Sequence, residues 1–277
     1  MKLRKVRNFL GYLLAGAAML FFFLYLRFPG DAITDDLEAY GMNRFPNLLV
    51  VMDAVEPTVS PGIAIENITV ALRERPGATL HADRLRVAPQ WLPLFRGRFS
   101  FLAKASGYGG EISVNSEFSE PFSLNGPFSA GAKFSGLRLE KCLWLQDVLS
   151  RQISGNLKGV FSFNGATEKP KNGSGKLDAV ILNGNVPLTE NLWGFDQIGF
   201  SRIDLKMGLR DRALRISELK VNGDKLSITL KGTILLADDF KESRMDLSGS
   251  AVIQGLGGRR IPITIGGKIG KPTIKTI

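Results

Sequence analysis

The sequence predicts a mainly β fold: a curled antiparallel sheet with short helices, preceded by one N-terminal transmembrane helix. Three observations support this prediction. An uncharged run extends from Phe9 to Leu26, apolar residues occupy every second position in much of the remaining chain, and glycine-containing turn signals separate those alternating runs. Alternation alone leaves open whether the sheet forms a half-barrel, a trough or a sandwich.

The uncharged run predicts a signal-anchor helix over residues 9–26. Its length is roughly 27 Å at about 1.5 Å per residue, enough to cross the hydrocarbon core of a bilayer. The preceding residues 1–8 carry Lys2, Arg4, Lys5 and Arg7 and predict a cytoplasmic basic tail. Residues 29–277 are then expected to form a β-rich domain on the other side, in the periplasm of a bacterium.

A cleaved signal peptide is the alternative for this segment. Ala15, Gly16 and Ala17 resemble a cleavage site, but they lie within the apolar run, whereas cleavage is expected after it. The sequence therefore favours an anchor that is retained.

Period-two alternation predicts strands with one buried face. The alternating sets are Ile63/Ile65, Phe99/Phe101, Ile112/Val114, Phe161/Phe163, Ile203/Leu205/Met207/Leu209, Leu214/Ile216, Leu226/Ile228/Leu230 and Ile261/Ile263/Ile265. Five Asn-Gly dipeptides, which suit type I′ hairpin turns, begin at Asn125, Asn164, Asn172, Asn183 and Asn222. Together these signals predict a meandering antiparallel sheet.

Three segments interrupt the strand pattern. Asp31 to Tyr40 has apolar residues at helical spacing and is followed by Gly41, which predicts a short helix that stops there. Leu139 to Gln152 carries an apolar stripe and predicts a second helix. Trp91 to Phe95 contains a proline and predicts a turn that places aromatic residues under the sheet.

A loose glycine-containing unit recurs in the second half, beginning at Ser154, Ser174, Asp246 and Ile263. Glycine within a strand permits strong curvature or close approach of another backbone. The repetition predicts a sheet that curls.

Composition excludes several classes of function. The net charge is +10, but the residues flanking the predicted anchor supply about half of it, and no dense basic run with interleaved aromatic residues points to nucleic-acid binding. The single cysteine, Cys142, cannot form an intramolecular disulfide and is expected to be a small buried residue.

The residues offer little catalytic or metal-binding chemistry. His81 is the only histidine, and with Cys142 it could form a nucleophilic dyad only if the fold joined them. Asp35, Asp36 and Glu38 are better explained as a solvated helix face, and Asp238-Asp239 as a turn. We therefore assign no catalytic, cofactor-binding or metal-binding residues, expect no cofactor, and predict that the protein is not an enzyme.

The order of motifs resembles a known family. After the apolar run come a short helix opened by Phe28–Ala32, the segment Pro61–Ile68, the segment Ala82–Val87, and Ala105–Ile112. This order resembles GspN of bacterial type II secretion systems, in the long form similar to AsmA-type periplasmic proteins. The resemblance implies a single-pass inner-membrane protein, with other secretion components as partners, that assists export of folded proteins. It brings no catalytic or ligand-binding residue.

The sequence leaves two functions open besides that of a hydrolase with an unrecognised site. The first is a scaffold of the secretion machinery. The second is an AsmA-like protein that binds or transfers phospholipid in a trough lined by residues such as Leu226, Ile228, Leu230, Ile263 and Ile265. An open apolar groove would favour the second, and a closed core the first.

Overall fold

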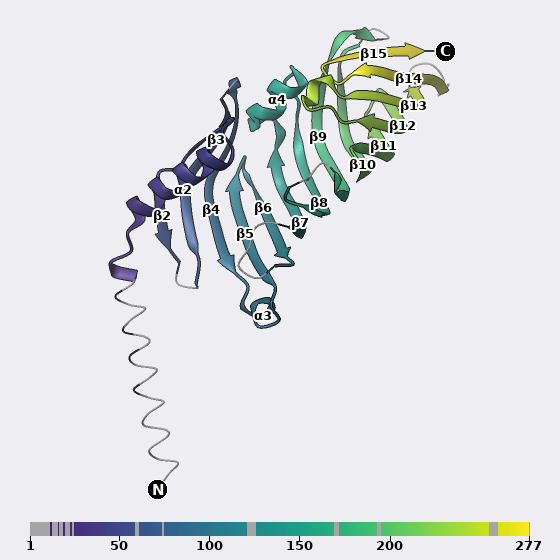
Figure 1. The fold of residues 1–277 in the computed structure, drawn as a ribbon. Helices are drawn as coiled ribbons and strands as arrows, with labels where there is room; N and C mark the ends of the chain where they lie inside the picture. The colour runs from purple at the N-terminus through teal and green to yellow at the C-terminus, as the bar shows by residue number, and fades with distance from the viewer. Residues whose placement is uncertain are drawn as a thin grey trace.

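One antiparallel sheet contains every strand of the described part of the chain (Figure 1). The structure is a computed structural model, and it describes residues 12, 16, 19, 23 and 25–276 except 59–60, 74, 121–125, 169–171, 193–194 and 255–259. The strands are β1 (Leu48–Val51), β2 (Ala54–Pro57), β3 (Ile63–Leu72), β4 (Arg75–Pro89), β5 (Phe99–Gly107), β6 (Gly110–Phe118), β7 (Pro127–Arg138), β8 (Ser154–Ala166), β9 (Ser174–Leu192), β10 (Phe195–Arg210), β11 (Ala213–Asn222), β12 (Leu226–Leu235), β13 (Arg244–Ile253), β14 (Arg260–Lys268) and β15 (Lys271–Thr276).

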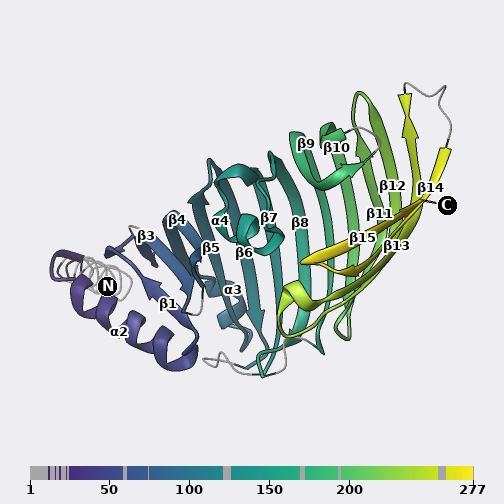
Figure 2. The ribbon, with the colours of Figure 1, turned by 90° about the horizontal axis from the view of Figure 1, so that it is seen from above.

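The strands follow one another as a meander. From β3 to β15 each strand pairs with the next in the sequence, while β1 and β2 both pair with β3. The two ends of the sheet do not pair with each other, so the sheet is open, and Figure 2 shows that it curls along its length. The prediction of a mainly β, curled antiparallel sheet is confirmed, and no second sheet makes it a sandwich within the described residues.

The helices are short and lie at the margins of the sheet. They are α2 (Gly30–Arg44), α3 (Trp91–Leu94) and α4 (Leu143–Leu149), with 3₁₀ turns η1 (Leu139–Lys141) and η3 (Phe240–Glu242). No helix among the described residues is long and apolar enough to cross a membrane. Most of the predicted anchor, residues 9–26, lies outside the described residues.

The first predicted helix exists, but its predicted end is wrong. Helix α2 continues through Gly41 to Arg44. Gly41 lies beside Val50 of β1, where a Cβ atom would make an ordinary contact of 3.5 Å, and the packing of α2 on the first strands extends the helix past the glycine. Ile33 and Leu37 of α2 pack with Val55 and Ile65, which places the helix over the first strands.

The second predicted helix is also present, as η1 followed by α4. Helix α4 ends at Leu149, and the next residue, Ser150, caps it in a left-handed conformation with φ of 54°. The prediction for Trp91–Phe95 is wrong in two respects: the segment forms helix α3, and Trp91 and Phe95 are exposed instead of packing under the sheet.

The Asn-Gly dipeptides serve different roles. Asn222-Gly223 lies at the β11–β12 turn, as predicted, whereas Asn164-Gly165 lies inside β8 and Asn183-Gly184 inside β9. Asn183 has φ of 50° and coincides with a shift in the pairing of β8 and β9. The signal there marks a β-bulge, which also tolerates positive φ.

Bulges keep the apolar residues on one face of the sheet. Opposite Asn156 and Ser154 of β8, strand β9 advances three residues, from Leu182 to Asn185. Similar shifts occur in β7 between Phe134 and Leu137, and in β11 between Ile216 and Leu219. Each extra residue reverses the inward and outward phase of the strand, and bulges increase local twist and bending, so they support the curl of the sheet.

Candidate functional site

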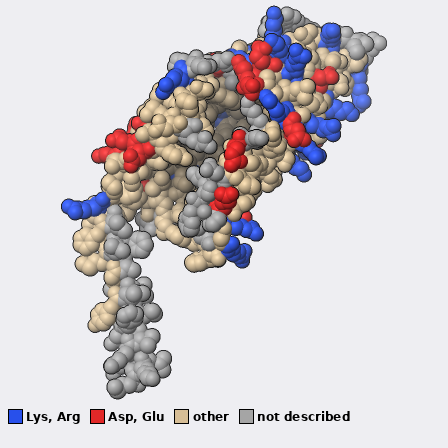
Figure 3. All heavy atoms as spheres, in the orientation of Figure 1, with Lys and Arg blue, Asp and Glu red and all other residues tan. Residues whose placement is uncertain are grey.

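The inner face of the curled sheet is almost continuously apolar, and we call this face from β5 to β14 the trough. Residues that are directly opposite in the register share a face. One such row runs through Ile181, Ile203, Val221, Ile228, Ala251 and Ile261, from β9 to β14. The space-filling view shows a hollow near the middle of the molecule (Figure 3).

Phenylalanine side chains line the part of the trough from β5 to β8. Their ring centroids lie 5.5 Å apart from Phe101 to Phe118, from Phe118 to Phe128, and from Phe128 to Phe163. Phe99 and Phe161 extend this phenylalanine ladder at its two ends. Phe118 is buried, whereas the other five rings are only partly buried. Partly buried aromatic rings in a row form an apolar surface that a ligand can still reach.

The C-terminal end of the trough is closed. Leu226, Ile228, Leu230 and Ile263 are buried in one cluster with Ala251 and Ile253. Ile198 of β10 and Ile265 of β14 both pack against this cluster although three strands separate them in the sheet. The sheet therefore curls tightly enough here to bury its own inner face.

This closure corrects part of the sequence hypothesis. The residues that were expected to line an open trough, Leu226, Ile228, Leu230, Ile263 and Ile265, belong to the closed end. The accessible part is the phenylalanine ladder of β5–β8, because α2 covers the first strands and the cluster fills the last ones.

Helix α4 and turn η3 bound one end of the central strands. Helix α4 contacts β4 and η3, and the Asp147 carboxylate pairs with the Lys241 ammonium at 3.6 Å. Figure 1 places α3 toward the opposite end of the same strands. Helix α4 and turn η3 therefore border the central trough at this end of its strands.

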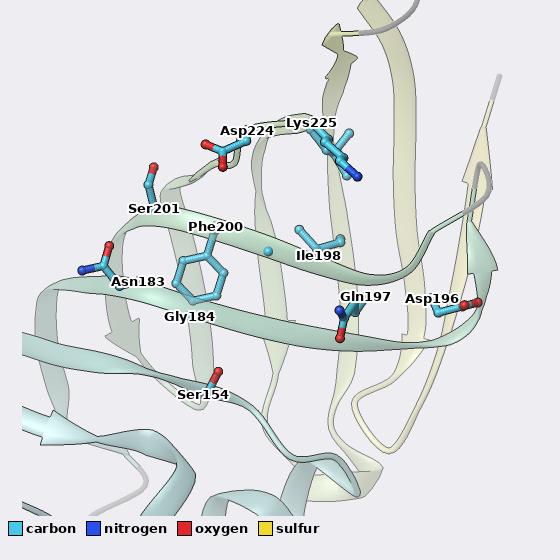
Figure 4. A pocket seen from close by; sticks show the side chains of 12 residues that line it. Ser154, Asn183, Gly184, Asp196, Gln197, Ile198, Phe200, Ser201, Asp224 and Lys225 are labelled. Atoms are coloured by element: carbon cyan, nitrogen blue, oxygen red, sulfur yellow. The ribbon is translucent and has the colours of Figure 1, made fainter.

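A pocket of about 930 Å³ adjoins the closed end (Figure 4). It is lined by the apolar residues Ile198, Phe200 and Leu226 and by the polar residues Asn183, Gln197, Asp224 and Lys225. The Phe200 ring occupies space that a side chain at Gly184 would need. A pocket that combines apolar and polar side chains suits an amphipathic ligand.

The opposite face of the sheet is polar. Lys133, Lys158, Lys176, Lys206, Lys220 and Lys231 lie on it, and Figure 3 shows basic residues gathered over the C-terminal strands. The Lys206 ammonium pairs with Glu218 at 3.0 Å. Hydrogen bonds from the Arg202 guanidinium lower the pKa of the Asp204 carboxyl. This face is therefore a solvated surface, in contrast to the trough.

His81 and Cys142 meet at a residue that the sequence did not single out, Tyr108. The His81 ring contacts Thr69 Oγ1 at 3.1 Å through Nδ1 and Asp83 at 3.3 Å through Nε2. The backbone N–H of His81 donates to Tyr108 Oη at 2.6 Å, and burial, followed by the negative charges of Cys142 and Asp83, raises the pKa of the Tyr108 phenol. Both ring nitrogens of His81 thus have partners other than the cysteine, which argues against a Cys-His dyad.

The acidic candidates have structural partners. Glu38 Oε1 accepts a hydrogen bond from Met52 N–H at 2.9 Å and ties α2 to the sheet. Asp238 pairs with Arg212 at 3.1 Å, and Asp239 caps η3 by accepting from Lys241 N–H. No group of His, Cys, Asp and Glu side chains within the described residues is arranged to hold a metal ion.

Comparison with known proteins adds no relative: no family model, no curated protein and no solved structure matches this chain.

Proposed function

We propose that the β domain binds the acyl chains of a phospholipid in the central trough. The observation that supports this is the phenylalanine ladder: it faces inward, it is only partly buried, and no second layer of sheet covers it among the described residues. Soluble monomers seldom leave contiguous apolar surface in contact with water. An acyl chain along β5–β8 would remove that surface from water and gain about 0.8 kcal/mol per buried CH₂ group.

The pocket near Phe200 suits the polar part of such a ligand. Ile198 lines this pocket and also packs against the closed apolar cluster, so the pocket lies beside the closed end of the trough. The proposal is for binding or transfer without chemical conversion, because Thr69 and Asp83 occupy both ring nitrogens of His81 and leave Cys142 without a histidine base.

Membrane attachment through residues 9–26 completes the proposal. The basic tail 1–8 would remain in the cytoplasm and residues 29–277 would face the periplasm. An alkaline phosphatase reporter fused after Ile277 is expected to be active. An inactive reporter, or a purified chain that begins at Met19 or later, would contradict this topology.

Photocrosslinking tests the lipid proposal and separates trough lipid from lipid around an anchor. The full chain is purified in mild detergent with a phospholipid that carries a photoreactive group on its acyl chain, and crosslinked peptides are mapped. We expect crosslinks on inward residues of β5–β8. Crosslinks confined to residues 9–26 would refute acyl binding in the trough.

A scaffold of a type II secretion system is the second candidate. It is supported by the resemblance to GspN and by the polar outer face, which leaves a broad surface for protein partners. The segments of this chain that resemble GspN include Pro61–Ile68, which leads into β3, and Ala105–Ile112, which spans the β5–β6 turn. Deletion should then block passage of folded exoproteins through the outer membrane while they still reach the periplasm, and the protein should co-purify with inner-membrane secretion components. Normal secretion in the deletion strain would exclude this role.

A further inference from the structure

The connection between β4 and β5 presents three large apolar side chains to solvent at one tip of the molecule. In α3 and the residue after it, Trp91 is 53% exposed, Leu92 is 77% exposed and Phe95 is 87% exposed. Neither the trough nor the closed cluster includes them. Exposed aromatic and aliphatic residues concentrated at one tip call for a partner.

The tip is held in an ordered conformation. Phe95 N–H donates to Trp91 O at 3.2 Å, and Arg96 N–H and Arg98 N–H donate to Pro93 O at 2.9 and 3.0 Å. At its base, Gln90 accepts from the buried Ser100 hydroxyl at 3.2 Å and donates to Asn115 at 2.9 Å. The side chains are therefore exposed by a defined backbone.

The positive charges next to the tip favour a negatively charged partner. The chain has no acidic residue from Arg84 to Gly110, and Arg96 and Arg98 follow the apolar side chains directly. Arg98 pairs with Glu117 at 2.8 Å, and Arg96 is exposed beside Phe95. Trp, Leu and Phe next to arginine are typical of segments that enter the interface of a bilayer with anionic lipids.

The size and position of the tip also favour a bilayer over a protein. A stable protein interface takes about 800 Å² from each partner, which is much more than three side chains supply. Figure 1 shows α3 below the lower ends of β4 and β5, and α2, which follows the predicted anchor in the sequence, begins toward the same lower side of the domain. A tip near an anchor needs little affinity of its own, because tethering raises its local concentration at the membrane.

We propose that the α3 tip inserts into the interface of an anionic membrane and forms a second contact between the domain and the bilayer. This contact depends on Trp91, Leu92 and Phe95 for insertion and on Arg96 for attraction to lipid phosphates. The proposal does not depend on what the trough binds.

Depth-dependent fluorescence quenching tests the insertion. In the full chain with Cys142→Ala, an environment-sensitive fluorophore is attached to Phe95→Cys and, in a separate control, to Val160→Cys, whose native residue is 53% exposed on the outer face of β8. Both proteins are reconstituted into vesicles of phosphatidylcholine, with and without phosphatidylglycerol, that contain spin-labelled acyl chains. Circular dichroism verifies that each variant retains its β structure.

We expect the fluorophore at position 95 to lie roughly 5–10 Å below the phosphates. Quenching there should be stronger with phosphatidylglycerol, should fall in a Leu92→Asp variant, and should be absent at position 160. Absence of quenching at position 95, or equal quenching at both positions, would overturn the proposal and leave the tip as a candidate contact for a protein.

Discussion

Phe118 and Phe128 stack across β6 and β7, with ring centroids 5.5 Å apart and ring planes inclined by 16°. The two residues are direct partners in the register, so their side chains share the inner face. Phe118 is buried, while Phe128 is partly exposed and continues to Phe163 in β8. This pair therefore joins the buried ring of the ladder, Phe118, to a ring that a ligand can reach, Phe128.

The closed end of the trough should respond to charge as a protein core does. Ile228 is 8% exposed, and Ile228→Asp would place a carboxylate among Leu226, Leu230 and Ile263. We expect a loss of about 3 kcal/mol or more in the free energy of unfolding, measured by urea denaturation. Thr229→Asp, one residue along on the outer face, should change it by less than about 0.5 kcal/mol. Similar losses in the two variants would contradict a closed inner core.

Close backbone approach in the curl is tested at Gly249. A Cβ atom there would overlap the carbonyl oxygen of Thr229 in the neighbouring strand, whereas at Gly266 the closest atom, Met245 O, would be 3.8 Å away. We expect Gly249→Ala to lower the free energy of unfolding by about 1–3 kcal/mol. Gly266→Ala should be neutral or slightly stabilising, because alanine restricts the unfolded chain. Equal midpoints of thermal unfolding for the two variants would show that the strands approach less closely.

The Tyr108 hydroxyl should contribute to stability in a pH-dependent way. Strand β5 pairs with β4 only from Arg84 onward, and Tyr108 Oη accepts the His81 N–H beyond that point. Tyr108→Phe removes this acceptor, so we expect a loss of about 1–3 kcal/mol at neutral pH.

Burial raises the pKa of Tyr108 above its ordinary value of 10.0. Above that pH the unfolded chain releases the phenolic proton while the folded chain retains it, so this contribution is complete below pH 10.0 and is lost as the pH rises through the folded pKa. Unfolding titrations should therefore show the wild type losing more stability than Tyr108→Phe above pH 10. Parallel pH profiles would disagree with this assignment.

Much of the sheet could be predicted from the sequence because one face is apolar throughout. Period-two sets such as Ile203/Leu205/Met207 and Leu226/Ile228/Leu230 lie in strands, and the expected helices lie near 31–40 and 140–150. Local patterns report whether a side chain is buried. They do not report how far the sheet curls, because burial in a closed end and in an open trough gives the same alternation.

The remaining errors have the same origin. Gly41 does not end its helix because α2 packs against β1 and β2, and Asn183-Gly184 forms a bulge because β8 continues to pair past it. Tyr108 could not be linked to His81 and Cys142 because three separate segments bring them together. These features depend on contacts between segments that are distant in the sequence.

Adjacent residues on β8 give the most direct test of lipid binding in the trough. Phe161 faces the ladder, and Val160 faces outward and is 53% exposed, so Phe161→Asp and Val160→Asp introduce the same charge on opposite faces of one strand. The measurement is the yield of photocrosslinked phospholipid on β5–β8 in full-length protein, with circular dichroism to confirm folding. The account predicts that Phe161→Asp reduces this yield about tenfold, which corresponds to roughly 1.4 kcal/mol, while Val160→Asp retains the wild-type yield. Equal yields from the two folded variants would contradict a lipid-binding trough.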